Sequence, residues 1–263
     1  MSAVGLDIVS EAAGTLAAAT ADRAAVPRLT EAFPDLSLDV AYEIQAEGCA
    51  RRVAAGERVV GAKLGLTARA KQEQMNVAEP VYGRLLSGGL HPSGDPVVVD
   101  ELIHPRVEPE IVFVMQDGLR GPGVTAAEVL GATRAVCCGL EIIDSRYADF
   151  SFTAPDVVAD NTSAARVVLG PTMVPPGGLD LALVGLLLEV DGSTVATAAG
   201  AATMGHPAEA VAMLANWLGC RGEAILPGWL VFSGGLTAAV LLAAGTTVTA
   251  TFGHLGSVSV RGI

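Results

Sequence analysis

The pattern of apolar and polar positions divides the chain into a part with helical periodicity and a part with short β-rich runs. Residues 6–56 follow a helical pattern that is interrupted at 25–27 and at 33–34, where prolines occur. Within this part, the stretch 37–55 carries a polar stripe at every fourth position opposite an apolar one, which is typical of a helix packed against something larger. We therefore predict a helical N-terminal part over residues 1–58.

From residue 59 onward the chain consists of short β-rich runs separated by glycine and proline, namely VVGAKLGL, VEPEIVFVM, GLEIID, LALVGLLLEV, LVFSG, TVTATF and SVSV. Two helical stretches interrupt them, at about 125–137 and 206–218. The pair Asp191-Gly192 between apolar runs is a strong hairpin signal. Because strand spacing is irregular and only two helices intervene, a regular βαβ repeat is disfavoured. The prediction is an α+β fold with a mixed, rolled β-sheet, in a single catalytic domain over 1–263 whose β-rich core spans 59–263.

Charge and hydropathy exclude several classes of protein. The net charge is -12 and the 14 arginines are scattered, which disfavours nucleic acid and anionic membrane as partners. Although 51% of the residues are hydrophobic, the apolar stretches 181–190 and 236–244 are shorter than the roughly 20 residues of a membrane span. The N-terminus lacks the basic and apolar regions of a signal peptide, so we predict a cytoplasmic protein. Its apolar composition favours a homo-oligomer.

Cysteines and histidines give no metal-site spacing. The four cysteines include the adjacent pair Cys137 and Cys138, which suits neither a disulfide framework nor a CxxC site, and we expect all four to be small core residues. The histidines His104, His206 and His254 each stand beside proline or glycine and are interpreted as structural. Nucleotide-binding and serine-hydrolase motifs are absent from the sequence.

Lys63 is one of two lysines and lies inside the apolar run VVGAKLGL. A buried ammonium in such a run has a pKa lowered by desolvation, which suits proton transfer or stabilisation of an enolate. The structural alternative is a side chain that reaches the surface from a strand end.

Three glutamates form a candidate metal site. Glu108 and Glu110 are two apart on a predicted strand, so their carboxylates share one face and repel each other unless a cation lies between them. Glu141 lies in the apolar run GLEIID, where an acid has to be paired, protonated or ligating. Three carboxylates suit Mg2+ or Mn2+ with open positions for a chelating substrate. The alternatives are a solvated ExE strand and pairing of Glu141 with Arg146 or Arg106.

Two polar segments are candidates for substrate contacts. ADNTSA supplies Asn161 and Ser163 between apolar runs, either as a turn or as a cradle for a carboxylate. The segment 67–80 is polar and helix-prone, and is either a mobile segment over a site or an exposed helix.

The chain resembles a known family in five ordered segments: GAKLGLTARAKQEQM, HPRVEPEIVFV, LEIIDSRYADF, VVADNTSA and GHLGSV. These are similar to the hydratase/decarboxylase family of meta-cleavage pathways, which is related to the fumarylacetoacetase C-terminal domain. The resemblance implies a rolled mixed sheet and Mg2+ or Mn2+ bound by Glu108, Glu110 and Glu141, with Lys63 as the active-site lysine. It also implies that the substrate is an unsaturated 2-oxo dicarboxylate. For such a substrate, we predict that Asn161 and Ser163 hold the C1 carboxylate and that Arg69 or Lys71 meets the distal carboxylate.

Within this resemblance, the sequence favours the decarboxylase activity, on 2-oxo-3-hexenedioate in aromatic catabolism. Hydratases of the family carry an acid in a P-D-F-G stretch, whereas this chain reads Pro80-Val81-Tyr82-Gly83. Val81 removes the base for water addition, and SGGLTAA at 233–239 is similar to the decarboxylase pattern. Tyr82 departs from the tryptophan of decarboxylases. The alternatives are a 2-oxopent-4-enoate hydratase, an acylpyruvate-type hydrolase, and a non-catalytic subunit that stabilises a partner. A complex with a hydratase is also expected.

Overall fold

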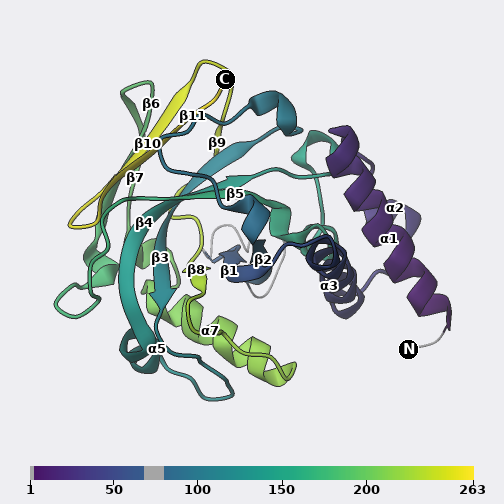
Figure 1. Ribbon diagram of the computed structural model, residues 1–263, viewed down its shortest axis with the longest axis horizontal. Helices are drawn as coiled ribbons and strands as arrows, with labels where there is room; N and C mark the ends of the chain where they lie inside the picture. The colour runs from purple at the N-terminus through teal and green to yellow at the C-terminus, as the bar shows by residue number, and fades with distance from the viewer. Residues whose placement is uncertain (1–2, 68–79) are drawn as a thin grey trace.

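The N-terminal helices lie together at one side of the molecule in the computed structural model, which describes residues 3–67 and 80–263 (Figure 1). They are α1 (Ala3–Asp22), α2 (Leu29–Ala32) and α3 (Leu38–Ala54). The Ser37 hydroxyl accepts a hydrogen bond from Val40 N at 3.3 Å and so caps α3. Their apolar side chains pack against α6 (Ala154–Ala159) and the start of β2. The predicted helical part and its two interruptions are confirmed.

A curled seven-stranded sheet forms the centre of the fold (Figure 1). Its strands, in spatial order, are β2 (Val81–Leu86), β1 (Val59–Gly65), β8 (Leu230–Phe232), β3 (Arg106–Met115), β4 (Thr133–Ile143) and β5 (Ala164–Leu169), and β9 (Val240–Leu241) also pairs with β3. β1 and β8 run parallel and the other pairs are antiparallel. The predicted mixed sheet is confirmed.

A second, four-stranded sheet packs on the outer face of the first. Its order is β11 (Gly256–Arg261), β10 (Thr247–Phe252), β6 (Gly185–Val190) and β7 (Ser193–Ala199). Asp191 and Gly192 join β6 to β7 with positive φ values of 50° and 78°, the geometry that such a two-residue turn requires, so the predicted hairpin is confirmed. The main core is built from both sheets together with α5 (Ala126–Ala132) and α7 (Pro207–Cys220).

Local predictions were wrong at several points. The helix expected at 125–137 ends at Ala132, and Thr133 begins β4 because this segment pairs along β3. In the run 181–190 the strand begins only at Gly185. Cys220 is exposed rather than in the core, whereas the other three cysteines are buried. The strands β2, β5 and β9 and helix α6 were not anticipated, since each is specified by its neighbours more than by its own pattern.

Short 3-10 turns complete the described chain: Ser87–Gly89, Val99–Glu101, Ala148–Phe150, Asn161–Ser163, Leu181–Leu183 and Gly200–Ala202. Within the described residues, no helix has both the length and the apolar character needed to cross a membrane.

Candidate active site

The register of β3 and β4 gathers three carboxylates on one face of the central sheet. Glu108 and Glu110 point the same way from β3, and Glu141 on β4 lies directly opposite Glu108. One carboxylate oxygen from each lies within 4.8 Å of the others. Glu110 and Glu141 are fully buried and Glu108 is half-buried. We call these three side chains the carboxylate cluster.

Lys63 reaches this cluster from β1, although β8 and β3 lie between β1 and β4 in the sheet. Its Nζ lies 3.0 Å from Glu141 Oε2 and donates a hydrogen bond of 3.0 Å to the carbonyl oxygen of Thr162. The side chain is 3% exposed, so it does not extend to the surface. The pairing of Glu141 with Arg146 or Arg106 is also wrong, since Arg146 pairs with Asp160 and the Arg106 guanidinium lies over Phe150.

The electrostatics of the cluster favour a bound cation. Burial, followed by the charge of Glu141, raises the pKa of Glu110 well above its usual range, and burial also raises the pKa of Glu141. Burial acts to lower the pKa of Lys63, as the sequence predicts, but the three carboxylates outweigh it and the pKa is raised. Correcting that expectation, Lys63 is a charged donor beside these anions.

The donor set fits a hard divalent ion. Glu110 Oε1 and Glu141 Oε1 are buried and have no hydrogen-bond partner among the described residues. Such orphaned anionic oxygens are costly unless a cation coordinates them. Glu110 Oε2 accepts a hydrogen bond of 2.6 Å from Gly234 N, which orients this carboxylate. Sequence reasoning missed this backbone donor, although the Ser233-Gly234-Gly235 run directly after a strand was a signal for it.

An unusual turn positions the Thr162 carbonyl. Asn161, Thr162 and Ser163 all have positive φ, at 49°, 53° and 56°, a region that residues other than glycine rarely occupy. The turn packs where the sheet carries Gly65 and Gly83. A Cβ at Gly65 would lie 2.6 Å from Thr162 Cγ2, and one at Gly83 would lie 2.5 Å from the Asn161 carbonyl oxygen. These two glycines therefore let the turn approach Lys63.

The predicted substrate-binding residues of this turn have other partners. The Asn161 amide accepts from Arg84 N at 2.7 Å and donates to Arg84 O at 2.9 Å, so it ties the turn to β2. Ser163 Oγ donates to Asp160 Oδ2 at 3.3 Å. This geometry favours a positioning role for both side chains over the contact with the C1 carboxylate that the sequence predicts.

Val81 lies on the same face as Lys63, because it pairs with Gly65 across β1 and β2. It is 2% exposed. Tyr82 points to the opposite face and stacks on Tyr42 with 4.7 Å between ring centroids. The presence of Tyr82 in place of the tryptophan of decarboxylases therefore does not alter the face of the sheet that carries Lys63. Arg69 and Lys71 lie outside the described residues.

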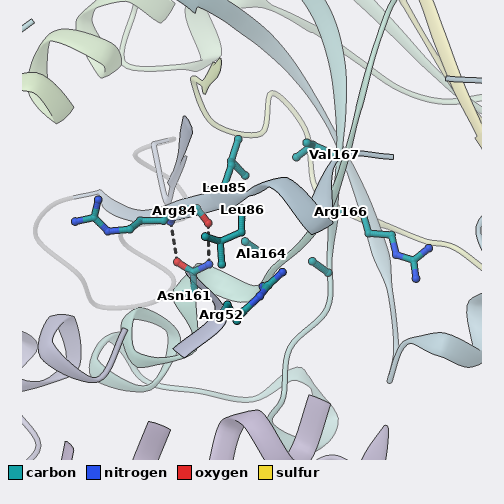
Figure 2. Close-up of a pocket in the computed structure, with 10 residues that line it drawn as sticks. Arg52, Arg84, Leu85, Leu86, Asn161, Ala164, Arg166 and Val167 are labelled. Carbon is teal, nitrogen blue, oxygen red and sulfur yellow. Dashed lines mark hydrogen bonds between the residues drawn. The ribbon is translucent and has the colours of Figure 1, made fainter. Parts of the chain in front are cut away.

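The hollows of the helical side are separate from the carboxylate cluster. Figure 2 shows one beside the turn, where the Asn161 amide is bonded to the Arg84 backbone and Arg52 and Arg166 line the rim. A cavity of about 520 Å³ adjoins it between α1, α3 and β5. Neither is lined by Lys63 or by the three glutamates.

A curled mixed sheet that carries a buried carboxylate cluster beside a lysine is suited to an enzyme that uses a divalent cation. Residues 53–261 match the family described as fumarylacetoacetate (FAA) hydrolase C-terminal, and the chain belongs to this family.

Two relatives are similar to this chain over most of its length. The 4-oxalocrotonate decarboxylase of Pseudomonas sp. (strain CF600) is 45% identical over 90% of this chain and 89% of its own length. The 2-hydroxypent-2,4-dienoate hydratase of Pseudomonas putida is 42% identical over 82% of this chain and 98% of its own. Among solved structures, 4-oxalocrotonate decarboxylase from Pseudomonas putida G7, complexed with magnesium and adipate, superposes with a TM-score of 0.94 at 40% identity, covering 98% of this chain and 97% of that one.

Proposed function

We propose that this protein is a carboxy-lyase that converts 2-oxo-3-hexenedioate (4-oxalocrotonate) to 2-hydroxypenta-2,4-dienoate and CO2. The observation that supports this most strongly is the buried carboxylate cluster with orphaned oxygens beside Lys63, in a chain similar to 4-oxalocrotonate decarboxylases. Glu108, Glu110 and Glu141 would hold Mg2+ or Mn2+. When bound, the ion supplies a Lewis acid for the 2-oxo acid group.

The chain's own residues account for the rest of the reaction. The bond between C5 and C6 breaks, CO2 leaves, and its electron pair moves through the conjugated chain to the C2 oxygen. Lys63 stabilises the charge that develops there and supplies the proton that makes the enol, because its ammonium is fixed by Glu141 and the Thr162 carbonyl. Val81 keeps an apolar surface on the Lys63 face, which favours release of an uncharged product.

The direct test supplies the purified protein with 2-oxo-3-hexenedioate and Mg2+. We expect stoichiometric CO2 release and little conversion of 2-hydroxypenta-2,4-dienoate to 4-hydroxy-2-oxopentanoate. Fast hydration without CO2 would instead assign the hydratase activity, which the 42% identical relative makes the second candidate. In either case the metal and lysine roles are tested separately.

A second arm of this test uses Val81→Asp. The new carboxylate places a negative charge on the Lys63 face and should slow decarboxylation by about tenfold or more, the scale of one misplaced electrostatic group. Because Val81 is buried, thermal melting accompanies the kinetics, and Val81→Thr serves as a matched control of nearly equal size. Unchanged CO2 release in a folded Val81→Asp variant would remove Val81 from the mechanism.

Assembly and location are further parts of the proposal. The homo-oligomer is supported by the apolar composition and by exposed apolar side chains such as Leu183, Leu187 and Val195. A complex with a hydratase would consume the reactive dienol, and a cytoplasmic location fits the four free thiols. Light scattering that returns a mass near 26.6 kDa at micromolar concentration would contradict the oligomer.

A further inference from the structure

Arg106 is the first residue of β3 and shares the face of the carboxylate cluster. Side chains alternate along a strand, so Arg106, Glu108 and Glu110 project from one face, while Val107 between them is buried in the main core on the other. The rise of about 3.4 Å per residue separates the Cα atoms of Arg106 and Glu108 by about 7 Å. The half-buried Arg106 side chain thus stands at the end of the row of glutamates.

The partners of Arg106 distinguish it from the other buried or half-buried arginines near the sheet. Arg84 pairs with Glu223, Arg146 with Asp160, and Arg166 with Glu101. In the part of the chain that the structure describes, Arg106 has no carboxylate partner.

An aromatic ring holds the guanidinium instead. Arg106 Cζ lies 4.3 Å from the centroid of the Phe150 ring. The same ring is 5.1 Å from the ring of His104, whose buried Nε2 also has no hydrogen-bond partner among the described residues. A guanidinium stacked on an aromatic ring is oriented by that contact but keeps its N–H donors in the plane free for a ligand. The Phe150 ring therefore orients the Arg106 guanidinium, and no carboxylate among the described residues neutralises its charge.

The charge balance of the carboxylate cluster indicates a role for such an arginine. Three glutamates and Lys63 together carry a net charge of two minus, which one divalent cation balances. A substrate with two carboxylates adds two negative charges that nothing in this balanced set offsets. A cation beside the second carboxylate would offset one of these charges, and it has to lie away from the metal, because that carboxylate is remote from the chelating 2-oxo acid group.

We infer that Arg106 binds the remote carboxylate of the substrate and selects dicarboxylates over monocarboxylates, with Phe150 positioning its guanidinium. The inference rests on the proposed function for the identity of the substrate. It gives Arg106 the role that the sequence assigns to Arg69 or Lys71. The planar donors of a guanidinium suit a carboxylate, which it can bind with two parallel hydrogen bonds.

The contact between Arg106 and the remote carboxylate also has a kinetic consequence. The remote carboxylate is the group that leaves as uncharged CO2, so its contact with Arg106 is strongest before the reaction and is lost in the transition state. Interactions of that kind lower KM without raising kcat. Arg106→Gln should therefore raise KM at least tenfold while kcat stays the same or increases.

The decisive experiment measures binding without turnover. The Mg2+-loaded protein is titrated by calorimetry with 2-oxohexanedioate, which lacks the double bond needed for CO2 loss, and with 2-oxohexanoate, which lacks the remote carboxylate. The wild type should bind the dicarboxylate at least tenfold more tightly. In Arg106→Gln the two affinities should become similar while that for 2-oxohexanoate is unchanged, and Arg106→Lys should retain an intermediate preference.

Two controls make the outcome clear. Arg134→Gln removes an exposed arginine from β4 and should alter neither affinity. Phe150→Leu should weaken only the dicarboxylate, by a factor of a few. An unchanged dicarboxylate preference in Arg106→Gln, or an equal loss of both ligands, would overturn the inference. Failure of the proposed function is seen separately, as a dicarboxylate preference without CO2 release from the unsaturated substrate.

Discussion

Two buried groups of charges contact the turn at 161–163, one through Lys63 and the other through Asp160, and they differ in how completely their polar atoms are hydrogen-bonded. The Arg146 guanidinium and the Asp160 carboxylate match one charge with one, and every side chain of this pair is hydrogen-bonded: Arg146 donates to Asp160 Oδ1 and to the carbonyl oxygens of Asp144, Asp160 and Ala164. The carboxylate cluster sets the Lys63 ammonium beside three glutamates, and among the described residues it leaves oxygens of Glu110 and Glu141 without a hydrogen-bond partner.

We propose that this difference separates a structural use of buried charge, in the Arg146–Asp160 pair, from a chemical one, in the carboxylate cluster. An ion pair whose polar atoms are all hydrogen-bonded holds neighbouring segments together and leaves no polar atom for a ligand. An unsatisfied cluster is a cost to the fold that a cation removes. Burial alone therefore does not mark a catalytic group, whereas burial combined with unmatched charge does. The following experiments test this contrast, beginning with the largest expected effect.

Glu110→Gln should abolish activity, and added Mg2+ should not restore it, because removal of one ligand leaves an incomplete site. Mg2+ should raise the melting temperature of the wild type but not of this variant, since only a binding-competent folded state gains stability from the ion. Glu101→Gln, which alters an exposed glutamate, is the control. A variant that keeps full activity would refute the metal site, as would activity of metal-stripped protein.

Arg146→Met should lower the free energy of unfolding by about 3–5 kcal/mol, the usual cost of leaving one member of a buried ion pair without its partner. Urea unfolding in the presence of Mg2+ measures this change. Arg146→Lys should recover part of it. A loss of activity with unchanged stability would mean that this pair is chemical rather than structural, and the contrast with the carboxylate cluster would fail.

Lys63→Met should reduce kcat by roughly 10²-fold, the scale for loss of a positioned acid or electrostatic group. Mg2+ should bind at least as tightly as in the wild type, because a positive charge beside the ion has been removed. Steady-state kinetics and calorimetric titration with Mg2+ decide the matter. If metal affinity falls together with kcat, then Lys63 holds the cluster together rather than acting on the substrate.

The smallest effect concerns the pH dependence of stability. Burial raises the pKa of Asp160 from its usual value of 3.8 to about 6, although Arg146 acts to lower it. The folded state then binds this proton more tightly than the unfolded state, so the group stabilises the fold below about pH 4 and the contribution is lost as the pH rises through 6. This contribution to the free energy of unfolding is roughly 1–3 kcal/mol at low pH.

Replacement of Asp160 by asparagine removes this titration. The free energy of unfolding of Asp160→Asn should fall less between pH 4 and pH 7 than that of the wild type, as measured by urea unfolding at several pH values. Equal slopes for the two proteins would show that the carboxyl group is better solvated than its burial indicates.

The sequence anticipated the features that depend on local periodicity. Helical spacing located the N-terminal helices, and a run of β-forming residues located most of the strands. The alternation of side chains along β3 placed Glu108 and Glu110 on one face without reference to any other strand. These features follow from repeats of 3.6 and 2 residues, which the chain carries in itself.

The tertiary structure decided which of these local faces meet. The register that sets Glu141 opposite Glu108 belongs to the β3–β4 pair, and the contact of Lys63 with Glu141 requires that the whole sheet curls. Thr133 lies in a strand rather than a helix for the same reason, because pairing with β3 outweighs its helical context. The partners of Arg106 and Arg146 likewise come from segments distant in sequence or from turns that no period describes. Periodicity fixes the direction of a side chain, but only the packing of distant segments fixes its neighbour.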